Sequence, residues 1–286
     1  MIYTENAIEL GRRIDAIRIH HTRFKVALDH IGRVIQLGSH LSSPPGITLI
    51  APAGAGKSLV IDCIKNNVCN WPFLRAGNVI CASLKESPSV SQIQDALLAN
   101  FHYALPPRPT RSDNRVLSTI LIEAIKQHKI QLIALDEFQH VFLSRKNDVH
   151  EAIIDWTKRL ISQTRCPVLL SGTEKLRSFE EADRQITSRV PTIVSLPAFA
   201  NDDEWKGILN AFAKDIKDVD LSRLATEFPT TIYKATQGSM RLLKLLLIEC
   251  AMIAVDQKEH VVSREHLDTA FGRLFGSDTS LSNPFK

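Results

Sequence analysis

Hydrophobic positions change their spacing twice along the chain, and these changes divide it into three parts. Apolar residues recur broadly at helical spacing over residues 5–37, which predicts a helical N-terminal segment. After the loop Ser42–Gly46, short apolar runs alternate with amphipathic stretches, a pattern typical of strands and helices in turn. Past Pro197 only helical spacing remains. The pattern therefore predicts an α/β core followed by a small helical region.

Five apolar runs predict the strands of the core: Ile47–Ala51, Asn78–Ser83, Ile130–Leu135, Val168–Ser171 and Thr192–Leu196. Helices are expected between these strands at residues 57–68, 89–102, 114–128 and 149–164. Because strands that alternate with helices favour a parallel sheet covered on both faces, we expect an α/β fold with flanking helices.

Four further helices are expected after the core, at residues 202–216, 219–228, 239–256 and 263–275. The expected domain organisation has four parts: an N-terminal helical segment (1–43), an α/β core (44–200), a helical lid (201–275) and a flexible polar tail (276–286).

Composition narrows the class of protein. The 286 residues are 44% hydrophobic and 23% charged, an ordinary globular mixture. The longest apolar stretch, Leu242–Val255, includes charged residues and is too short for a bilayer, and the N-terminus does not resemble a secretory signal. We therefore expect a cytoplasmic protein with no membrane partner.

Five scattered cysteines without a C-x-x-C pair predict small buried side chains instead of disulfides or zinc ligands. The net charge of +4 permits nucleic-acid binding without demanding it.

Residues 51–58, APAGAGKS, match the phosphate-binding pattern G-x-x-x-x-G-K-[ST], except that Ala51 replaces the first glycine. Glycines in such a loop let backbone N–H groups converge on phosphate oxygens. The lysine supplies a cation for the β- and γ-phosphates, and the serine hydroxyl is a ligand for Mg²⁺. The strand before the loop and the helix after it argue against a chance glycine turn. The sequence thus predicts an ATP and Mg²⁺ site formed by Pro52, Ala53, Gly54, Ala55, Gly56, Lys57, Ser58 and Leu59.

A second half of this site is predicted at residues 130–137, IQLIALDE, an apolar strand that ends in two acids. Asp136 at the end of the strand would hold Mg²⁺. Glu137 would orient or deprotonate the attacking water. Two adjacent carboxylates favour hydrolysis of ATP over phosphoryl transfer to a small metabolite.

The order of these motifs resembles that of AAA+ ATPases across residues 45–275. The resemblance implies that Thr173 is the sensor residue near the attacking water, where the alternative is an N-cap of the next helix. It also implies an arginine finger that reaches a neighbouring subunit, for which Arg189 comes first and Arg184 second, with surface ion pairing as the alternative. Arg241, in the first turn of a helix, resembles the lid arginine that contacts nucleotide, since a cation there is unfavourable without an anion.

Within AAA+ ATPases, the chain is similar to TniB/TnsC-type transposition regulators and to MuB-like target-selection ATPases. The segments that carry this likeness are RRIDAIRIHHTRFKVALDHIGRVI, LDEFQHV, LLSGTEKL and RQITSRVPTIVSLPAF. The resemblance implies a homo-oligomer, as a ring or helical filament, that assembles with ATP on double-stranded DNA without sequence preference. It further implies partners, a DDE-type transposase and a TniQ-like target selector, and disassembly on hydrolysis. Whether targeting is RNA-guided, as in CRISPR-associated systems, stays open.

DNA contacts in such an assembly would be made mostly to phosphates. By resemblance, Lys85 and Arg111 lie in loops on the DNA-facing side, and solvated surface charge is the alternative for each.

Two other functions share the same nucleotide-site residues. A DnaC/IstB-like or Orc-like ATPase would load a helicase or mark an origin, and we would expect an added DNA-binding module that the roughly 11 residues after the last predicted helix cannot form. A nucleotide-gated scaffold would bind ATP without needing turnover, which Glu137 and the candidate finger argue against. A metabolic kinase fits least, since no acceptor-binding signature is visible.

Overall fold

The computed structural model describes residues 3–101, 114–143, 147–177, 184–276 and 282–286. The chain divides into two compact units, an α/β unit of Arg23–Leu196 and a helical unit of Met1–Thr22 with Pro197–Lys286. The expected N-terminal segment 1–43 is therefore not one unit. Its two helices, α1 (Glu5–Ala16) and α2 (Thr22–Gly38), bury their apolar faces in different cores.

The α/β unit is built on a parallel sheet of five strands in the order β2-β3-β4-β1-β5. The strands are β1 (Ile47–Ile50), β2 (Val79–Ser83), β3 (Leu132–Asp136), β4 (Val168–Gly172) and β5 (Thr192–Ser195). All four pairings are parallel, which confirms the expected fold class. Because β4 lies between β1 and β3, the carboxyl ends of these three strands meet at one edge of the sheet.

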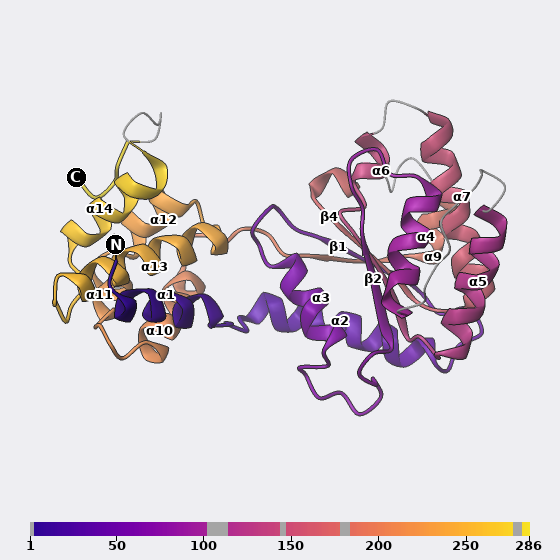
Figure 1. Ribbon diagram of the computed structural model, residues 1–286, viewed down its shortest axis with the longest axis horizontal. Coiled ribbons are helices and arrows are strands. Elements are labelled where there is room, and N and C mark those ends of the chain that lie inside the picture. Colours follow the sequence, from indigo (N-terminus) through magenta and orange to yellow (C-terminus); the bar gives the residue numbers. More distant parts are fainter. Residues whose placement is uncertain (1–2, 102–113, 144–146, 178–183, 277–281) are drawn as a thin grey trace. The chain divides into compact units, whose positions relative to one another are not determined.

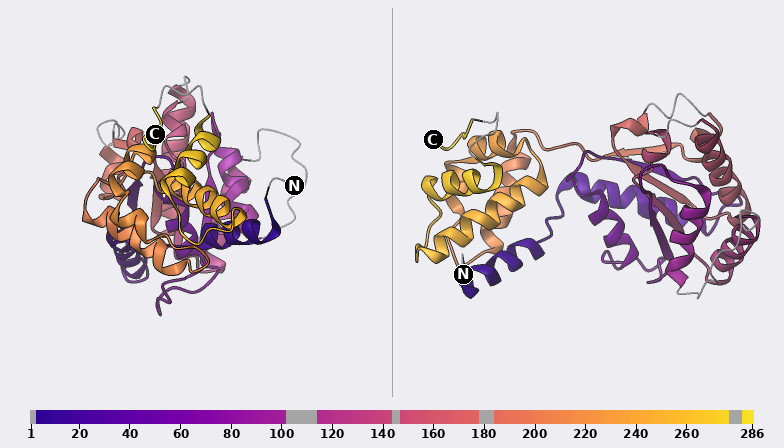
Figure 2. Two further views of the ribbon diagram at one scale, coloured as in Figure 1. Left: turned by 90° about the vertical axis from the view of Figure 1, so that its left-hand side faces the viewer. Right: turned by 45° about the horizontal axis from the view of Figure 1, so that its top comes forward.

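Helices cover both faces of this sheet (Figure 1, Figure 2). They are α2, α3 (Lys57–Lys65), α4 (Val90–Leu98), α5 (Asn114–Gln127), α6 (His140–Leu143), α7 (Asn147–Thr164) and α9 (Arg184–Arg189), with 3₁₀ turns η1 (Ala99–Phe101) and η3 (Glu174–Leu176). Alternate strand residues serve opposite cores. Leu132 and Ala134 pack with α2 and α3, whereas Ile133 and Leu135 pack with α4, α5 and α7. Apolar runs without polar alternation follow from this burial on two faces.

The helical unit contains α1, α10 (Asp203–Asp215), α11 (Ser222–Thr226), α12 (Pro229–Thr236), α13 (Met240–Asp256) and α14 (Arg264–Phe275). The pattern of apolar residues did not predict α12, which begins with a proline in its first turn. In Figure 1 the N-terminal helix α1 lies beside α13, although more than 200 residues separate them in the sequence. Leu10 and Ile14 are buried there, and a Cβ added to Gly11 would lie 2.7 Å from the sulfur of Met252.

The end of the chain corrects a second expectation. The predicted flexible tail, 276–286, closes on the helical unit over its last residues. Phe285 is only 2% exposed and packs edge-on against Phe271. Arg264 donates from Nε to the Phe285 carbonyl at 2.7 Å. Phe285 is therefore part of the helical core.

Two further findings bear on the class of protein. Among the helices of the described residues, none has the length and apolar content needed to cross a bilayer. The five cysteines are free thiols. Cys63, Cys166 and Cys250 are buried, as expected of small packing side chains, whereas Cys69 and Cys81 are only half-buried.

Candidate nucleotide site

The phosphate-binding loop joins the end of β1 to the start of α3. Gly54 and Gly56 have positive φ angles of 79° and 99°, in the region that favours glycine. A Cβ added to Gly56 would meet nothing within 4 Å, so the backbone conformation and not crowding demands glycine there. The residue preceding α3 makes no side-chain hydrogen bond to cap it. Because the N-cap of α3 is Gly56, no side chain of that residue accepts from the first N–H groups of the helix, and such groups can bind an anion.

Ala51, at the position of the missing glycine, is fully buried and continues the sheet. Its N–H donates to the carbonyl of Gly172 at 2.9 Å. This strand-like role accommodates a methyl group, so the departure from the pattern leaves the loop itself intact.

Lys57 is a buried cation without a carboxylate partner among the described residues. Its side chain is 6% exposed, and Nζ donates to the carbonyls of Ala51 at 3.0 Å and Pro52 at 3.5 Å. A buried charge is costly unless it is paired and hydrogen-bonded. Two loop carbonyls meet only part of this need, and the oxygens of a phosphate chain would meet the rest.

The two predicted acids lie at the carboxyl end of β3, separated from the phosphate loop's strand only by β4. Asp136 is 7% exposed, and its Oδ1 accepts the N–H of Glu137 at 2.9 Å. Glu137 has a φ angle of 55°, unusual for a residue with a side chain and found preferentially at functional sites. The turn is tied to β4 by the N–H of Phe138, which donates to the Ser171 carbonyl at 2.9 Å.

Thr173 directly follows β4 at the same edge of the sheet. The alternative role, capping the next helix, is not observed, since its side chain makes no cap hydrogen bond to η3. Its Oγ1 and the Oγ of Ser171 are both buried without a hydrogen-bond partner among the described residues. Buried hydroxyls are normally paired, so two unpaired ones beside the acids indicate a place for a polar ligand.

One residue of the site has no role in the sequence-based prediction. Gln139 lies in the turn after β3, where its Nε2 donates to Oε2 of Glu137 and its Oε1 accepts the N–H of Thr173 at 3.2 Å. The signal in the sequence was a glutamine two residues after Asp-Glu, within the segment LDEFQHV. Nothing in the local sequence pattern indicated which groups Gln139 would bind through hydrogen bonds.

These residues fit ATP with Mg²⁺. Gly56 leaves open space beside the loop for a phosphate, and Lys57 supplies a cation. The hydroxyl of Ser58 and the carboxylate of Asp136 are ligands that Mg²⁺ takes together with phosphates and water. The residues that the motifs predicted therefore lie at three adjacent strand ends.

The structure gives less information on the three candidate arginines. Arg189 ends α9 half-buried, and its carbonyl accepts the N–H of Gly46 at 2.7 Å. Arg184 begins α9, but its side chain lies outside the described residues. Arg241 is exposed in the first turn of α13, in the helical unit, where Ser239 caps the helix through the N–H of Leu242. Their contacts with nucleotide stay predictions.

Of the two predicted DNA contacts, Lys85 is exposed after β2 and lines a cavity of about 350 Å³ against α4. Arg111 lies outside the described residues. Neither role is tested by these positions.

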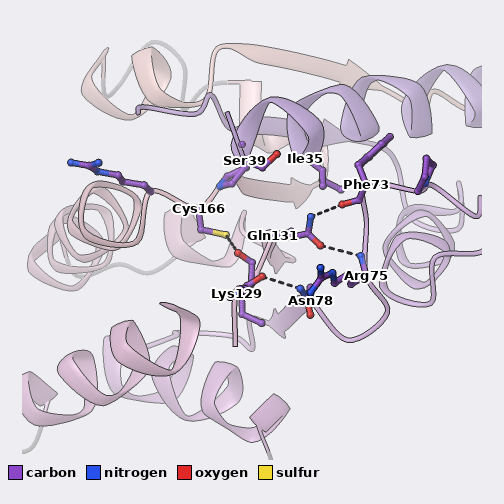
Figure 3. Close-up of a pocket in the computed structure, with 13 residues that line it drawn as sticks. Ile35, Ser39, Phe73, Arg75, Asn78, Lys129, Gln131 and Cys166 are labelled. Atoms are coloured by element: carbon purple, nitrogen blue, oxygen red, sulfur yellow. Dashed lines mark hydrogen bonds between the residues drawn. The ribbon is translucent and has the colours of Figure 1, made fainter. Parts of the chain in front are cut away.

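A separate cavity of about 480 Å³ opens at the amino ends of β2, β3 and β4, opposite the phosphate loop (Figure 3). Gln131 bridges two backbone groups there, with Nε2 donating to the Phe73 carbonyl at 2.6 Å and Oε1 accepting the Arg75 N–H at 3.0 Å. Asn78 donates to the carbonyl of Lys129 at 3.0 Å. None of the predicted nucleotide-site residues lines this cavity.

Comparison with solved structures identifies the fold. The chain is similar to the Aeropyrum pernix ORC2 protein in its ADPNP-ADP complexes (16% identity, TM-score 0.64), covering 93% of this chain and 70% of that one. It is also similar to Aeropyrum pernix ORC1 in complex with DNA (15%, TM-score 0.65, covering 90% and 66%) and to Drosophila ORC bound to DNA (12%, TM-score 0.64, covering 96% and 67%). At these identities the likeness shows the AAA+ fold alone.

Comparison of sequences identifies the family. No curated protein matches the chain. The sequence model of a family described as "Bacterial TniB protein" matches residues 13–200, a range that includes the phosphate loop and both acids. Because this match spans well over half of the chain and the fold agrees with it, the protein belongs to the TniB family of AAA+ ATPases.

Proposed function

We propose that the protein is an ATP-dependent regulator of DNA transposition. It binds ATP with Mg²⁺, oligomerises on double-stranded DNA, connects a TniQ-like target selector to a DDE-type transposase, and disassembles on hydrolysis. The observation that carries the proposal is that Lys57, Asp136 and Glu137 lie at the same edge of the sheet, after β1 and β3 with only β4 between them, in a chain of the TniB family.

Hydrolysis follows from the chemistry of these groups. Lys57 moves from the loop carbonyls to the β- and γ-phosphate oxygens and offsets their charge. Glu137 takes a proton from the water whose oxygen attacks the γ-phosphorus while the bond to the β-phosphate oxygen breaks. Ser58 and Asp136 would hold Mg²⁺, which would supply positive charge to offset the negative charge of the phosphates. The hydroxyl of Thr173, unpaired among the described residues, is available to the attacking water or the γ-phosphate.

Completion of the site by a neighbouring subunit would couple hydrolysis to assembly. Arg189 or Arg184 would reach the γ-phosphate of the adjacent subunit, and Arg241 would contact nucleotide from the helical lid. An isolated subunit would then hydrolyse ATP slowly. Lys85 and Arg111 would contact DNA phosphates, in keeping with a modest net charge of +4 and with binding that ignores sequence.

Electron microscopy with double-stranded DNA tests the proposal, comparing ATP, a non-hydrolysable analogue and ADP. We expect filaments or rings only with the triphosphates. Glu137→Gln should trap the assembly in ATP, because binding is retained while the base is lost. Glu151→Gln, an exposed residue of α7, is the matched control and should behave as wild type. An ATP-loaded Glu137→Gln protein that stays dispersed would contradict the switching scheme.

An initiator- or loader-like ATPase is the second candidate, favoured by the likeness to ORC proteins solved with DNA. Monomers in all three nucleotide conditions, with assembly appearing only when a protein partner is added, would support that function in place of a DNA-templated switch.

A further inference from the structure

The side chain of Gln139 joins the carboxyl ends of two neighbouring strands, β3 and β4, through one amide group. Its Nε2 donates to Oε2 of Glu137, at the end of β3, and its Oε1 accepts the N–H of Thr173, at the end of β4, at 3.2 Å. The candidate base and the candidate sensor are therefore connected directly, by a residue to which no role has been assigned.

Packing leaves this amide little freedom. Gln139 is 5% exposed. A Cβ on Gly172 would overlap its Oε1, so only glycine at that position of β4 admits the bridge. The hydrogen bond from Phe138 to the Ser171 carbonyl fixes the turn on the same strand. A carboxylate that hydrogen-bonds to such a constrained group is itself constrained.

The chemistry of the bridge selects an amide. Glu137 as a carboxylate only accepts hydrogen bonds, and the N–H of Thr173 only donates one, while the Thr173 carbonyl already accepts the N–H of Leu176. A glutamine supplies a donor to the first and an acceptor to the second at the same time. The bond occupies one carboxylate oxygen and leaves the other for water.

We propose that Gln139 is a positioning residue for ATP hydrolysis: it holds the Glu137 carboxylate to the backbone of Thr173, so that base and sensor strand move together. This inference rests on the proposed function, because it requires that Glu137 act as the base. The positive φ of Glu137, 55°, supports this role, since a residue in that conformation depends on its surroundings to hold it.

The test is steady-state hydrolysis by the full chain with double-stranded DNA, using Gln139→Met, which keeps the length of the side chain and removes both hydrogen bonds. We expect kcat to fall about 100-fold, the effect of misplacing a reacting group by about 1 Å, with KM for ATP unchanged. Gln139→Asn, which keeps the amide but is one methylene shorter, should show the same loss and serves if the first variant does not fold.

Gln131→Met is the matched control. Gln131 also bridges two backbone groups, but at the opposite end of the sheet (Figure 3). It should lower stability while leaving the kcat of the folded protein unchanged. A purely structural role for Gln139 predicts the same behaviour for both glutamines.

Single-turnover rates in the Glu137→Gln background distinguish this proposal from the proposed function. If Gln139 acts through Glu137, Gln139→Met adds no further loss there. Equal rates for wild type and Glu137→Gln would overturn the hydrolytic function and this proposal with it. If wild type is faster than Glu137→Gln, the hydrolytic function stands. The role of Gln139 alone would then be overturned by either of two results: a kcat of Gln139→Met equal to that of wild type, or a loss of rate that persists in the Glu137→Gln background.

Discussion

The ammonium group of Lys57 lies 3.0 Å from the carbonyl oxygen of Ala51, the residue that replaces the first glycine of the phosphate-binding pattern. The Lys57 cation thus donates to a carbonyl of its own phosphate-binding loop, at the position where alanine replaces the usual glycine. Since the contact uses only the backbone of Ala51, the methyl group does not interfere with it.

Lys57→Ala is expected to weaken ATP binding by about 100-fold, because each charge-assisted hydrogen bond contributes about 1.5–3 kcal/mol. Titration with a fluorescent ATP analogue measures the effect. Lys65→Ala, at the exposed end of the same helix, is the control and should bind normally. Normal binding by Lys57→Ala would show that the nucleotide site lies elsewhere.

Gly56→Ala should weaken ATP binding and lower stability by about 1–2 kcal/mol, because a Cβ is strained at a φ of 99°. Ala51→Gly should leave ATP affinity within about threefold and lower stability by about 0.5–1 kcal/mol through backbone entropy. Urea unfolding and ATP titration of both variants measure these effects. A large gain in affinity for Ala51→Gly would mean that the methyl obstructs the phosphates.

Burial, with a smaller contribution from the Asp136 charge, raises the pKa of the Cys81 thiol from 9.0 to about 11. At pH 8 its reaction with iodoacetamide should therefore be about 100-fold slower in the folded protein than in the urea-unfolded chain, in proportion to the thiolate fraction. Stability should fall as the pH rises above about 9, because the unfolded thiol ionises while the folded one does not. Alkylation followed by peptide mass mapping over pH 7–10 measures the first effect. Equal rates in the two states at pH 8 would contradict the raised pKa.

Phe285→Ala should lower the stability of the helical unit by about 3 kcal/mol, the cost of removing a buried aromatic side chain. Guanidinium unfolding, followed through tryptophan fluorescence to which Trp205 in the same core contributes, measures it. Lys286→Ala should have no effect, since its side chain is exposed and Arg264 binds only its carbonyl. An unchanged unfolding midpoint for Phe285→Ala would support the expectation that the tail, 276–286, is flexible.

The local sequence predicted those features that one contiguous segment contains. The five strands were located to within one or two residues, and the phosphate loop and the acids at the end of β3 were recognised, because each depends on spacing within about ten residues. Helix ends were less accurate. The helix expected at 57–68 ends at Lys65, and the one expected at 89–102 ends at Leu98 and continues as a 3₁₀ turn.

Tertiary structure decided the rest, for one physical reason: the contacts join residues that are distant in sequence and carry no shared local pattern. Only the fold shows that α1 packs on α13, that Phe285 enters the helical core, and that the expected 1–43 segment is divided between two units. The same holds within the site. The sequence by itself determined that Lys57, Asp136 and Glu137 are present; the strand order, which places β4 between β1 and β3, brought Gln139 and Thr173 together around the base.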